Sequence, residues 1–392
     1  MPRHLILREN EPARAVDLSS EEAEALASAE LAIVSRSPGA HRWEVAAGSK
    51  VGAVRLGDLQ VTVQPKIPIS RLLFLVGYSR RPNHWRELPV QLDPHADLPD
   101  ALAHAFAHWA RRALEQGLLQ GYRTVEEALP VLRGRVRVGD QLARRPGRAL
   151  PLEITYDDFT IDITENRLLL AATQRLLSMP QVSPIARRAL QRIRLLLGEV
   201  TPLRRGAVLP LWTPSRLNTR YQPALELADL ILAGDSFELR AGDLRVSGFV
   251  LDMWRIFEDF VCVALKQAML PFAGRSTLQH RLHLDRAGEV PMKPDFLWTG
   301  RDGQKVVVDA KYKAEKPDGF PNADLYQLLA YCTVLGIQTG HLVYAKGNET
   351  QRVHAVAGSG VSIHCHTLDL AVPMSDLLAQ IADLAERLVV TL

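Results

Sequence analysis

The feature that most constrains this chain is a hairpin pattern at residues 294–311, Pro-Asp-Phe-Leu-Trp-Thr-Gly-Arg-Asp-Gly-Gln-Lys-Val-Val-Val-Asp-Ala-Lys. Its two apolar runs, residues 296–298 and 306–308, are rich in β-favouring side chains. The sequence Gly-Arg-Asp-Gly at 300–303 supplies turn-forming residues between them. This order predicts two antiparallel strands joined by a tight turn.

The predicted hairpin brings three charged side chains together. Pairing about a turn centred near Asp302 places Asp295 opposite Asp309, or within one residue of it. Successive side chains alternate between the two faces of a strand, so Asp309 and Lys311 share a face. We therefore expect two carboxylates and one ammonium to converge on one patch of a short sheet.

This patch has two interpretations. Two carboxylates opposite each other on paired strands destabilise an exposed sheet by about 0.2–1 kcal/mol. A divalent cation would reverse that effect, because Mg²⁺ is commonly held by one or two carboxylates together with water and phosphate oxygens. A neighbouring lysine could then orient or help deprotonate a metal-bound water that attacks a phosphodiester. The alternative is a surface hairpin in which Asp309 and Lys311 form a solvated ion pair.

The composition is that of an ordinary globular protein. The chain has 392 residues, of which 47% are hydrophobic and 23% charged, enough for two or three domains with sizeable cores. No apolar run reaches the length of about 18 residues that suggests a membrane helix, and the N-terminus lacks a signal-peptide pattern. The three cysteines are far apart and form no CxxC pair. We therefore expect a cytoplasmic protein without a membrane segment.

Positive charge is concentrated in the middle of the chain. Residues 101–220 contain 19 Arg and no Lys against 10 acidic residues. Guanidinium groups make bidentate contacts with carboxylate or phosphate that ammonium groups cannot make. The region therefore suits nucleic acid or an acidic partner, although a codon preference for Arg over Lys would give the same bias.

Hydrophobic periodicity predicts an α+β multidomain chain. Its N-terminal part is β-rich, with two strands about Gly57-Asp58. Its middle is mostly helical, with a helix at 98–120, an antiparallel helix pair at 165–179 and 184–197, and a basic strand at 131–138. Turn-rich residues 234–248 lead, as a hinge, into a C-terminal α/β domain. The predicted domains are residues 1–97, 98–247 and 248–392.

Two predicted helices flank the hairpin and carry polar side chains of interest. The apolar stripe of the helix at 251–269 includes Glu258, where an unpaired acid would be costly. Glu258 therefore either faces the hairpin to bind or orient a cation or water, or reaches solvent at the edge of the stripe. On the helix at 322–335, Gln327 and Tyr331 lie four residues apart and share a face.

Three other groups contain residue types that bind metals. The first is a histidine pair one turn apart on a helix, without a third ligand nearby. The second is an acidic cluster before a helix, where a solvated turn is the simpler interpretation, and the third flanks a cysteine that must point to the opposite face of its strand. We expect no metal at any of them. They are His104 with His108, Asp157 with Asp158 and Asp162, and His364 with His366.

The order of the C-terminal motifs resembles the RecB-like branch of the PD-(D/E)xK nucleases. Four elements in one order and one structural context are more specific than any single motif. The resemblance implies that the catalytic residues are Asp295, Asp309, Lys311 and Glu258, and that Gln327 and Tyr331 contact DNA. The ligands that it implies for Mg²⁺ or Mn²⁺ are Asp295, Asp309 and the backbone carbonyl of Ala310, with Glu258 as a further candidate.

Three N-terminal motifs narrow the resemblance to McrC-like proteins, the endonuclease subunits of McrBC-type modification-dependent restriction systems. The motifs are Leu-Gln-Val-Thr-Val-Gln-Pro-Lys-Ile at 59–67, Leu-Arg-Gly-Arg-Val at 132–136, and Tyr-Asp-Asp-x-Thr at 156–160 followed by Asn166. The resemblance covers most of the chain, and residues from about 175 to 250 carry none of its motifs.

This resemblance implies a Mg²⁺-dependent endonuclease that cuts double-stranded DNA together with a separate McrB-like AAA+ NTPase ring. The partner would read the modified base, and the N-terminal part of this chain would dock in the ring pore and stimulate hydrolysis. In keeping with that division, this sequence lacks a GxxxxGK[ST] phosphate loop. Two alternatives stay open: a stand-alone RecB-like repair or recombination nuclease, and a non-catalytic adaptor whose nuclease fold only grips DNA.

Overall fold

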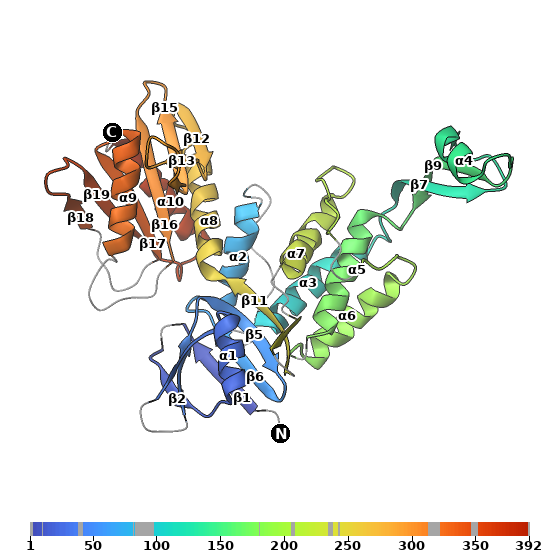
Figure 1. Cartoon of the computed structure of the whole chain (residues 1–392), viewed down its shortest axis with the longest axis horizontal. Helices are drawn as coiled ribbons and strands as arrows, with labels where there is room; N and C mark the ends of the chain where they lie inside the picture. The colour runs from blue at the N-terminus through green and yellow to red at the C-terminus, as the bar shows by residue number, and fades with distance from the viewer. Residues whose placement is uncertain are drawn as a thin grey trace. The chain divides into compact units, whose positions relative to one another are not determined.

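The chain folds into two compact units, residues 1–101 with 234–392, and residues 102–233. We call them the first and the second unit. Figure 1 shows their helices and strands. The N-terminal and C-terminal parts, which the sequence predicts as two domains, both belong to the first unit. The computed structural model describes residues 3–9, 11–37, 42–80, 82, 98–179, 181–204, 208–233, 238–241, 244–312, 322–345 and 352–390.

The N-terminal part of the first unit is built on a five-stranded sheet. Two of its strands form the predicted antiparallel hairpin, with Gly57 in the left-handed region (φ 59°) at the turn. The predicted hinge at 234–248 is wrong, because its residues include two strands of this sheet. Burial of residues 249–251 beside the neighbouring strand outweighs the turn-forming glycines. In sheet order the strands are β1 (Arg3–Arg8), β6 (Leu59–Gln64), β5 (Lys50–Leu56), β11 (Leu244–Asp252) and β10 (Glu238–Ala241).

A smaller sheet and two helices complete this part. Helix α1 (Ser20–Ser28) begins with a capping box, in which the Ser19 hydroxyl accepts from the Glu22 amide and the Glu22 carboxylate accepts from the Ser19 amide. Helix α2 packs against the C-terminal part, with the Phe74 and Phe260 ring centroids 5.9 Å apart. The remaining elements are β2 (Arg14–Val16), β4 (Trp43–Ala47), β3 (Ala32–Arg36) and α2 (Ile69–Arg80).

The C-terminal part contains a six-stranded mixed sheet. The predicted hairpin is present: β15 and β16 pair antiparallel, whereas β16, β17 and β19 run parallel to one another. A separate short pair is formed by β13 (Leu282–His283) and β14 (Pro291–Met292). In sheet order the strands are β12 (Gly274–Leu278), β15 (Phe296–Gly300), β16 (Lys305–Lys311), β17 (Thr339–Ala345), β19 (Ser362–Leu368) and β18 (Arg352–Ala355).

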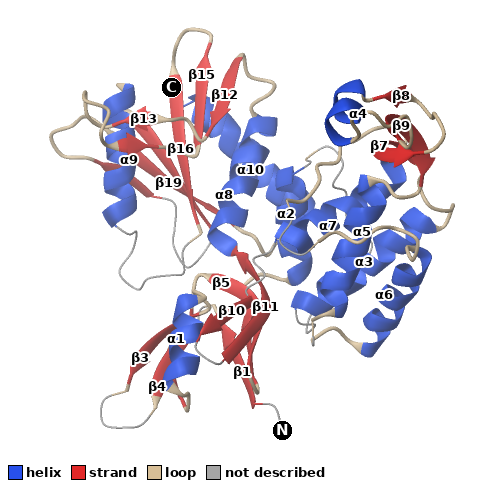
Figure 2. Ribbon diagram, turned by 45° about the vertical axis from the view of Figure 1, so that its right-hand side comes forward, coloured by secondary structure: helices blue, strands red, loops and turns tan. Residues whose placement is uncertain are grey.

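Helices cover both faces of this sheet, with α9 (Asn322–Leu335) on one side and α8 (Met253–Ala268) and α10 (Met374–Val390) on the other (Figure 2). The core beneath α9 is apolar and closed, since Leu328 and Cys332 pack on Val307 and Leu342 with no side chain more than a few per cent exposed. Burial of this kind contributes about 25 cal/mol per Å² of apolar surface. The core therefore fixes the strands that carry the charged side chains.

The second unit is a group of helices from which a long β arm projects (Figure 1). Helix α6 begins with Ser183 as N-cap and proline at its first position, so its start follows from local sequence. Residues 164–196 form the predicted helix pair. The helices are α3 (Leu98–Leu114, whose first four residues belong to the first unit), α5 (Thr164–Leu177), α6 (Pro184–Leu196) and α7 (Gln222–Ala233), with a 3₁₀ turn η1 (Thr219–Tyr221).

The arm, residues 121–160, is a three-stranded sheet with one short helix. The strand predicted at 131–138 is much shorter, because the chain turns at Gly134 (φ 73°) and helix α4 begins at Val138. A Cβ on Gly134 would lie 2.3 Å from the Thr155 carbonyl oxygen, so no other residue fits there. The arm consists of β7 (Gly121–Leu129), β8 (Arg135–Val136), α4 (Val138–Arg144) and β9 (Leu152–Thr160).

Candidate active site

The hairpin register brings the two aspartates together as the sequence predicts. The strands pair with Phe296 opposite Val308, and one further step places Asp295 opposite Asp309. Both carboxylates lie on the face that α9 covers, since Asp309 alternates with the core residue Val307. Asp295 is 6% exposed and Asp309 is 1% exposed, so this pair is buried rather than solvated.

Asp295 is held by hydrogen bonds from two other segments. Its Oδ2 accepts from the backbone amide of Ala310 at 2.9 Å, and its Oδ1 accepts from the Gln279 side-chain amide at 3.3 Å. The Gln279 side chain also donates to Oε1 of Glu258 at 2.5 Å. One amide thus links the carboxylates of Glu258 on α8 and Asp295 before β15.

The position of Gln279 depends on an unusual backbone conformation. It follows β12 with φ 51°, in the left-handed region that side chains other than glycine seldom adopt. Its amide donates to the Asp295 carbonyl oxygen at 2.9 Å, which holds this turn against the start of β15. Backbone conformations of this kind cost free energy and concentrate at functional sites.

Lys311 completes the charged group. Its Nζ lies 2.6 Å from Oδ2 of Asp309, and the two side chains are 20% and 2% exposed. Burial alone would lower the pKa of Lys311, but the adjacent Asp309 carboxylate outweighs it and raises that pKa. Lys311 therefore stays an ammonium group near neutral pH.

Burial and mutual repulsion raise the pKa values of the carboxyl groups. Burial, followed by the charges of Asp309 and Glu258, raises the pKa of Asp295 to about 9. The pKa of Asp309 is also raised by burial, which outweighs the ion pair with Lys311. The two aspartates therefore favour the binding of a proton or a metal cation, which would offset their negative charge.

Gln327 and Tyr331 lie on α9, where the Gln327 side-chain amide donates to the Tyr331 hydroxyl at 2.8 Å. Gln327 is exposed, whereas Tyr331 is 2% exposed and packs in the core beneath α9. Burial, followed by the nearby charge of Asp309, raises the pKa of Tyr331 to about 12. The Tyr331 hydroxyl is thus close enough to Asp309 to be affected by its charge. Of the two side chains, only Gln327 is exposed to solvent.

The donor atoms present suit a magnesium-type cation with few protein ligands. Among the residues that the structure describes, no three His, Cys, Asp or Glu side chains converge to hold a metal. Asp295 and Asp309 supply two adjacent carboxylates, and Glu258 stands one amide away from Asp295. Mg²⁺ usually keeps several water molecules and takes one or two carboxylates, so this set fits it.

Sequence reasoning missed two groups beside the site. Gln279 carried no motif, because its role depends on the register of β12 and on its backbone conformation. Asp324, in the first turn of α9, is 4% exposed and accepts from the Tyr344 hydroxyl at 3.1 Å. Its charge also acts on Lys311. An acidic residue three positions before Gln327 on the same helix could have indicated a site residue. Acidic residues are common in a first helical turn, however, because they interact favourably with the helix dipole.

Most members of the competing clusters contact other side chains. In the second unit, Asp157, Asp158 and Asp162 bond to Thr124, Arg133 and Arg123 respectively, and His104 lies 3.3 Å from the Ser183 hydroxyl. In the first unit, His341 Nδ1 lies 3.1 Å from His366 Nε2, and the ring centroid of His364 lies 5.3 Å from that of His341. The described histidines and acids of these clusters form no three-ligand metal group.

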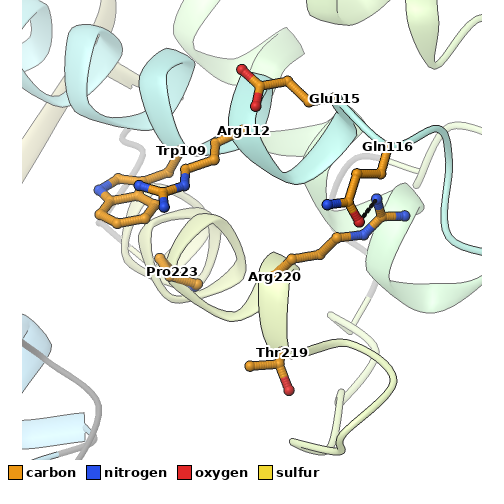
Figure 3. A pocket seen from close by; sticks show the side chains of 7 residues that line it. All are labelled: Trp109, Arg112, Glu115, Gln116, Thr219, Arg220 and Pro223. Atoms are coloured by element: carbon orange, nitrogen blue, oxygen red, sulfur yellow. Dashed lines mark hydrogen bonds between the residues drawn. The ribbon is translucent and has the colours of Figure 1, made fainter.

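A hollow of about 470 Å³ lies in the second unit, between α3 and the start of α7 (Figure 3). The Arg112 guanidinium lies 5.6 Å from the Trp109 ring centroid, and Arg220 donates to Gln116 Oε1 at 3.3 Å. The lining carboxylate of Glu115 pairs with Arg111 at 2.8 Å. This hollow therefore offers cationic groups rather than metal ligands.

Together, the fold and site define a mixed α+β multidomain protein with a buried pair of carboxylates and a lysine on a hairpin. The family model for the McrBC 5-methylcytosine restriction system component matches residues 45–345. The chain belongs to this family. The resemblance to McrC-like proteins that the sequence predicts is therefore confirmed.

A comparison with solved structures finds one that shares the fold. The chain resembles a chain of the Thermococcus gammatolerans half-complex of McrB AAA+ hexamers with bound McrC, with a TM-score of 0.61, 16% identity, and coverage of 98% of this chain and 99% of that one. A second T. gammatolerans McrBC complex gives a TM-score of 0.43, 17% identity, and coverage of 68% and 88%. A comparison with curated proteins finds no match. None of the described helices is long and apolar enough to cross a membrane.

Proposed function

We propose that this chain is the DNA endonuclease subunit of a modification-dependent restriction system, and that it hydrolyses phosphodiesters at the hairpin site. The observation that carries the proposal is the buried group of Asp295, Asp309 and Lys311 in a member of the McrBC family. A buried pair of carboxylates with raised pKa values is costly in a purely structural role. A cation-dependent reaction would explain why the chain keeps this buried pair.

Asp295 and Asp309 would hold Mg²⁺ or Mn²⁺, with the carbonyl of Ala310 as a further ligand and Glu258 next to the set. When bound, such an ion supplies Lewis-acid stabilisation of the phosphate and a more acidic water molecule. Gln279 keeps Glu258 and Asp295 at a fixed separation, because its amide bonds to both. The Ala310 amide fixes the orientation of Asp295.

Lys311 would act as a cation. Because its pKa is raised by Asp309, its Nζ donates hydrogen bonds and offsets negative charge rather than removing a proton at neutral pH. Gln327, exposed on α9, would contact double-stranded DNA, since side-chain amides can bond to phosphate oxygens or base edges. Tyr331 would orient Gln327 through its hydroxyl.

The arm is the element that we propose docks on an AAA+ NTPase ring and stimulates its hydrolysis. It carries large apolar side chains that are exposed, a feature of interaction surfaces. Many of its arginines are already paired: Arg137 and Arg145 both bond to Glu153, which is 4% exposed. Docking therefore depends on apolar contact as well as charge. The exposed apolar side chains of the arm are Tyr122, Val131, Leu132, Val138, Leu142, Leu150 and Phe159.

The test is cleavage of methylated double-stranded DNA by the full chain with its NTPase partner and nucleotide. Cleavage in Mg²⁺ or Mn²⁺ and its loss in a chelator are expected. The partner's nucleotide turnover in Mg²⁺ should rise when the chain is added, which separates docking from cutting. Stimulated turnover without any DNA cleavage would reduce the chain to a non-catalytic adaptor.

A further inference from the structure

The residue that follows the proposed catalytic lysine is tied to the N-terminal sheet. Tyr312 comes directly after Lys311, and its hydroxyl donates to Oε2 of Glu9 at 2.8 Å, across 303 positions of sequence. Its ring packs against Phe257 of α8, with centroids 5.8 Å apart. The end of β16 is therefore fixed from outside its own sheet.

Glu9 and Lys66 form the other side of this contact. Strands β1 and β6 are parallel, so their carboxyl ends lie side by side at one end of the five-stranded sheet. Glu9 follows the end of β1 and Lys66 follows the end of β6. The same Oε2 of Glu9 accepts from the Lys66 backbone amide at 2.8 Å. The Lys66 ammonium lies 4.5 Å from the Tyr312 ring centroid, within range of a cation–π interaction. We call Glu9, Lys66 and Tyr312 the strand clamp.

The strand clamp is a partly buried polar contact, since both hydrogen bonds to Glu9 are partly shielded from solvent. Burial raises the pKa of Glu9 above its ordinary value. A hydrogen bond in such surroundings is costly to lose, because the group left behind stays desolvated without a partner. The strand clamp thus links the ends of β1 and β6 to the residue beside Lys311.

We propose that Tyr312 is a positioning residue for the nuclease reaction. Through Tyr312, the strand clamp holds the Lys311 ammonium group beside the Asp309 carboxylate. This inference rests on the proposed nuclease function. Tyr312 touches neither carboxylate in the contacts described, so it acts through Lys311. The N-terminal sheet would then set how well the C-terminal site is formed.

The experiment compares four variants of the full chain with the wild type: Tyr312→Phe, Glu9→Ala, Glu9→Gln and, as control, Tyr326→Phe. Tyr312→Phe keeps the ring and removes only the hydroxyl. Glu9→Gln keeps an acceptor oxygen, and Tyr326 is a 68% exposed tyrosine of α9. The readouts are kcat and KM of Mg²⁺-dependent cleavage with the NTPase partner, and hydrogen exchange of residues 305–311 without metal.

We expect Tyr312→Phe and Glu9→Ala to lower kcat roughly tenfold to a hundredfold, as displacement of a positioned group does, with KM unchanged. Exchange of residues 305–311 should quicken in both. Glu9→Gln should retain most of the activity, and Tyr326→Phe should match the wild type. Unchanged kcat and unchanged exchange in Tyr312→Phe and Glu9→Ala would overturn the inference.

The exchange measurement separates this inference from the proposed function. If the wild type fails to cleave DNA, the proposed function falls, and exchange alone then decides whether the clamp orders β16. Faster exchange in Tyr312→Phe and Glu9→Ala supports the clamp, and wild-type exchange refutes it. If kcat falls as far in Glu9→Gln as in Glu9→Ala, an acceptor oxygen at residue 9 is not sufficient for activity. That result would also contradict the inference.

Discussion

The ammonium nitrogen of Lys311 lies 2.6 Å from Oδ2 of Asp309, two residues earlier on the same strand. The contact follows from strand alternation, which puts both side chains on one face. It is not the solvated surface pair of the alternative interpretation, because the Asp309 side chain is 2% exposed. The pair therefore belongs to a buried site, which the Asp295 carboxylate completes.

Replacing Lys311 with alanine should abolish cleavage and leave the partner's nucleotide turnover unchanged. The change removes the cation beside Asp309, but it lies on the hairpin and leaves the second unit intact. Lys305→Ala, at the turn end of the same strand, is the matched control. Cleavage rate and NTP turnover measured in one reaction distinguish the two effects. A loss of turnover in Lys311→Ala alone would contradict the division of labour.

Gln279 offers a test of the link between Glu258 and Asp295. Gln279→Gly permits the left-handed backbone (φ 51°) but removes the amide that bonds both carboxylates. We expect metal affinity and cleavage to fall roughly 10- to 100-fold, as is typical when groups that orient metal ligands are lost. The midpoint of a Mn²⁺ titration gives the affinity. Unaltered Mn²⁺ dependence in this variant would show that Gln279 does not organise the site.

The histidine cluster on the other face of the sheet predicts an acid-labile C-terminal part. Burial, with Arg387 and His364 nearby, lowers the pKa of His366 from 6.5 to about 4. In the unfolded chain this histidine binds a proton below about pH 6.5. Stability is therefore complete above pH 6.5 and falls as the pH drops towards 4.

The loss from His366 alone should be about 2 kcal/mol between pH 7 and pH 5. Denaturant unfolding at the two pH values measures it in the wild type, in His366→Gln and in the exposed-histidine control His283→Gln. His366→Gln should reduce the difference between pH 7 and pH 5, and His283→Gln should not. Equal pH dependence in all three proteins would rule out His366 as the cause.

The apolar side chains of the arm predict where the ring binds. The rings of Tyr122 and Phe159 lie 5.2 Å apart and are 77% and 57% exposed. We expect the double change Tyr122→Ser with Phe159→Ser to weaken binding at least tenfold, about the loss seen for buried aromatic anchors. Ile185→Ser, at a 66% exposed position of α6, is the control. A ring affinity unchanged in the double variant, measured by titration of NTP turnover, would exclude the arm.

The hairpin and its charged patch were predictable from local sequence. The turn at 300–303 sets the register, and the register sets which side chains share a face, so the approach of Asp295 to Asp309 was predictable. Helices α5, α6 and α9 were predictable from apolar spacing and caps. The bounds of α5 and α6 differ from the predicted ones by one or two residues, because helix ends depend on single hydrogen bonds.

Contacts between distant segments were not predictable in this way. Strand β11 pairs with β5, nearly 200 positions earlier, and only tertiary packing turns the predicted hinge into a strand. An N-terminal fragment that keeps this sheet must therefore extend to Asp252. Gln279 and the pair of Glu9 with Tyr312 are similar cases, because neither residue type nor spacing marks them.

The most direct measurement is the rate of Mg²⁺-dependent cleavage by Asp309→Asn, with the NTPase partner present. This substitution keeps the shape of the side chain and removes the charge that pairs with Lys311 and would bind the cation. Asp302→Asn, in the exposed turn of the same hairpin, is the control. We predict that Asp309→Asn does not cleave, whereas Asp302→Asn cleaves and both stimulate NTP turnover as the wild type does. Cleavage by Asp309→Asn at the wild-type rate would show that the hairpin carboxylates are not the nuclease site.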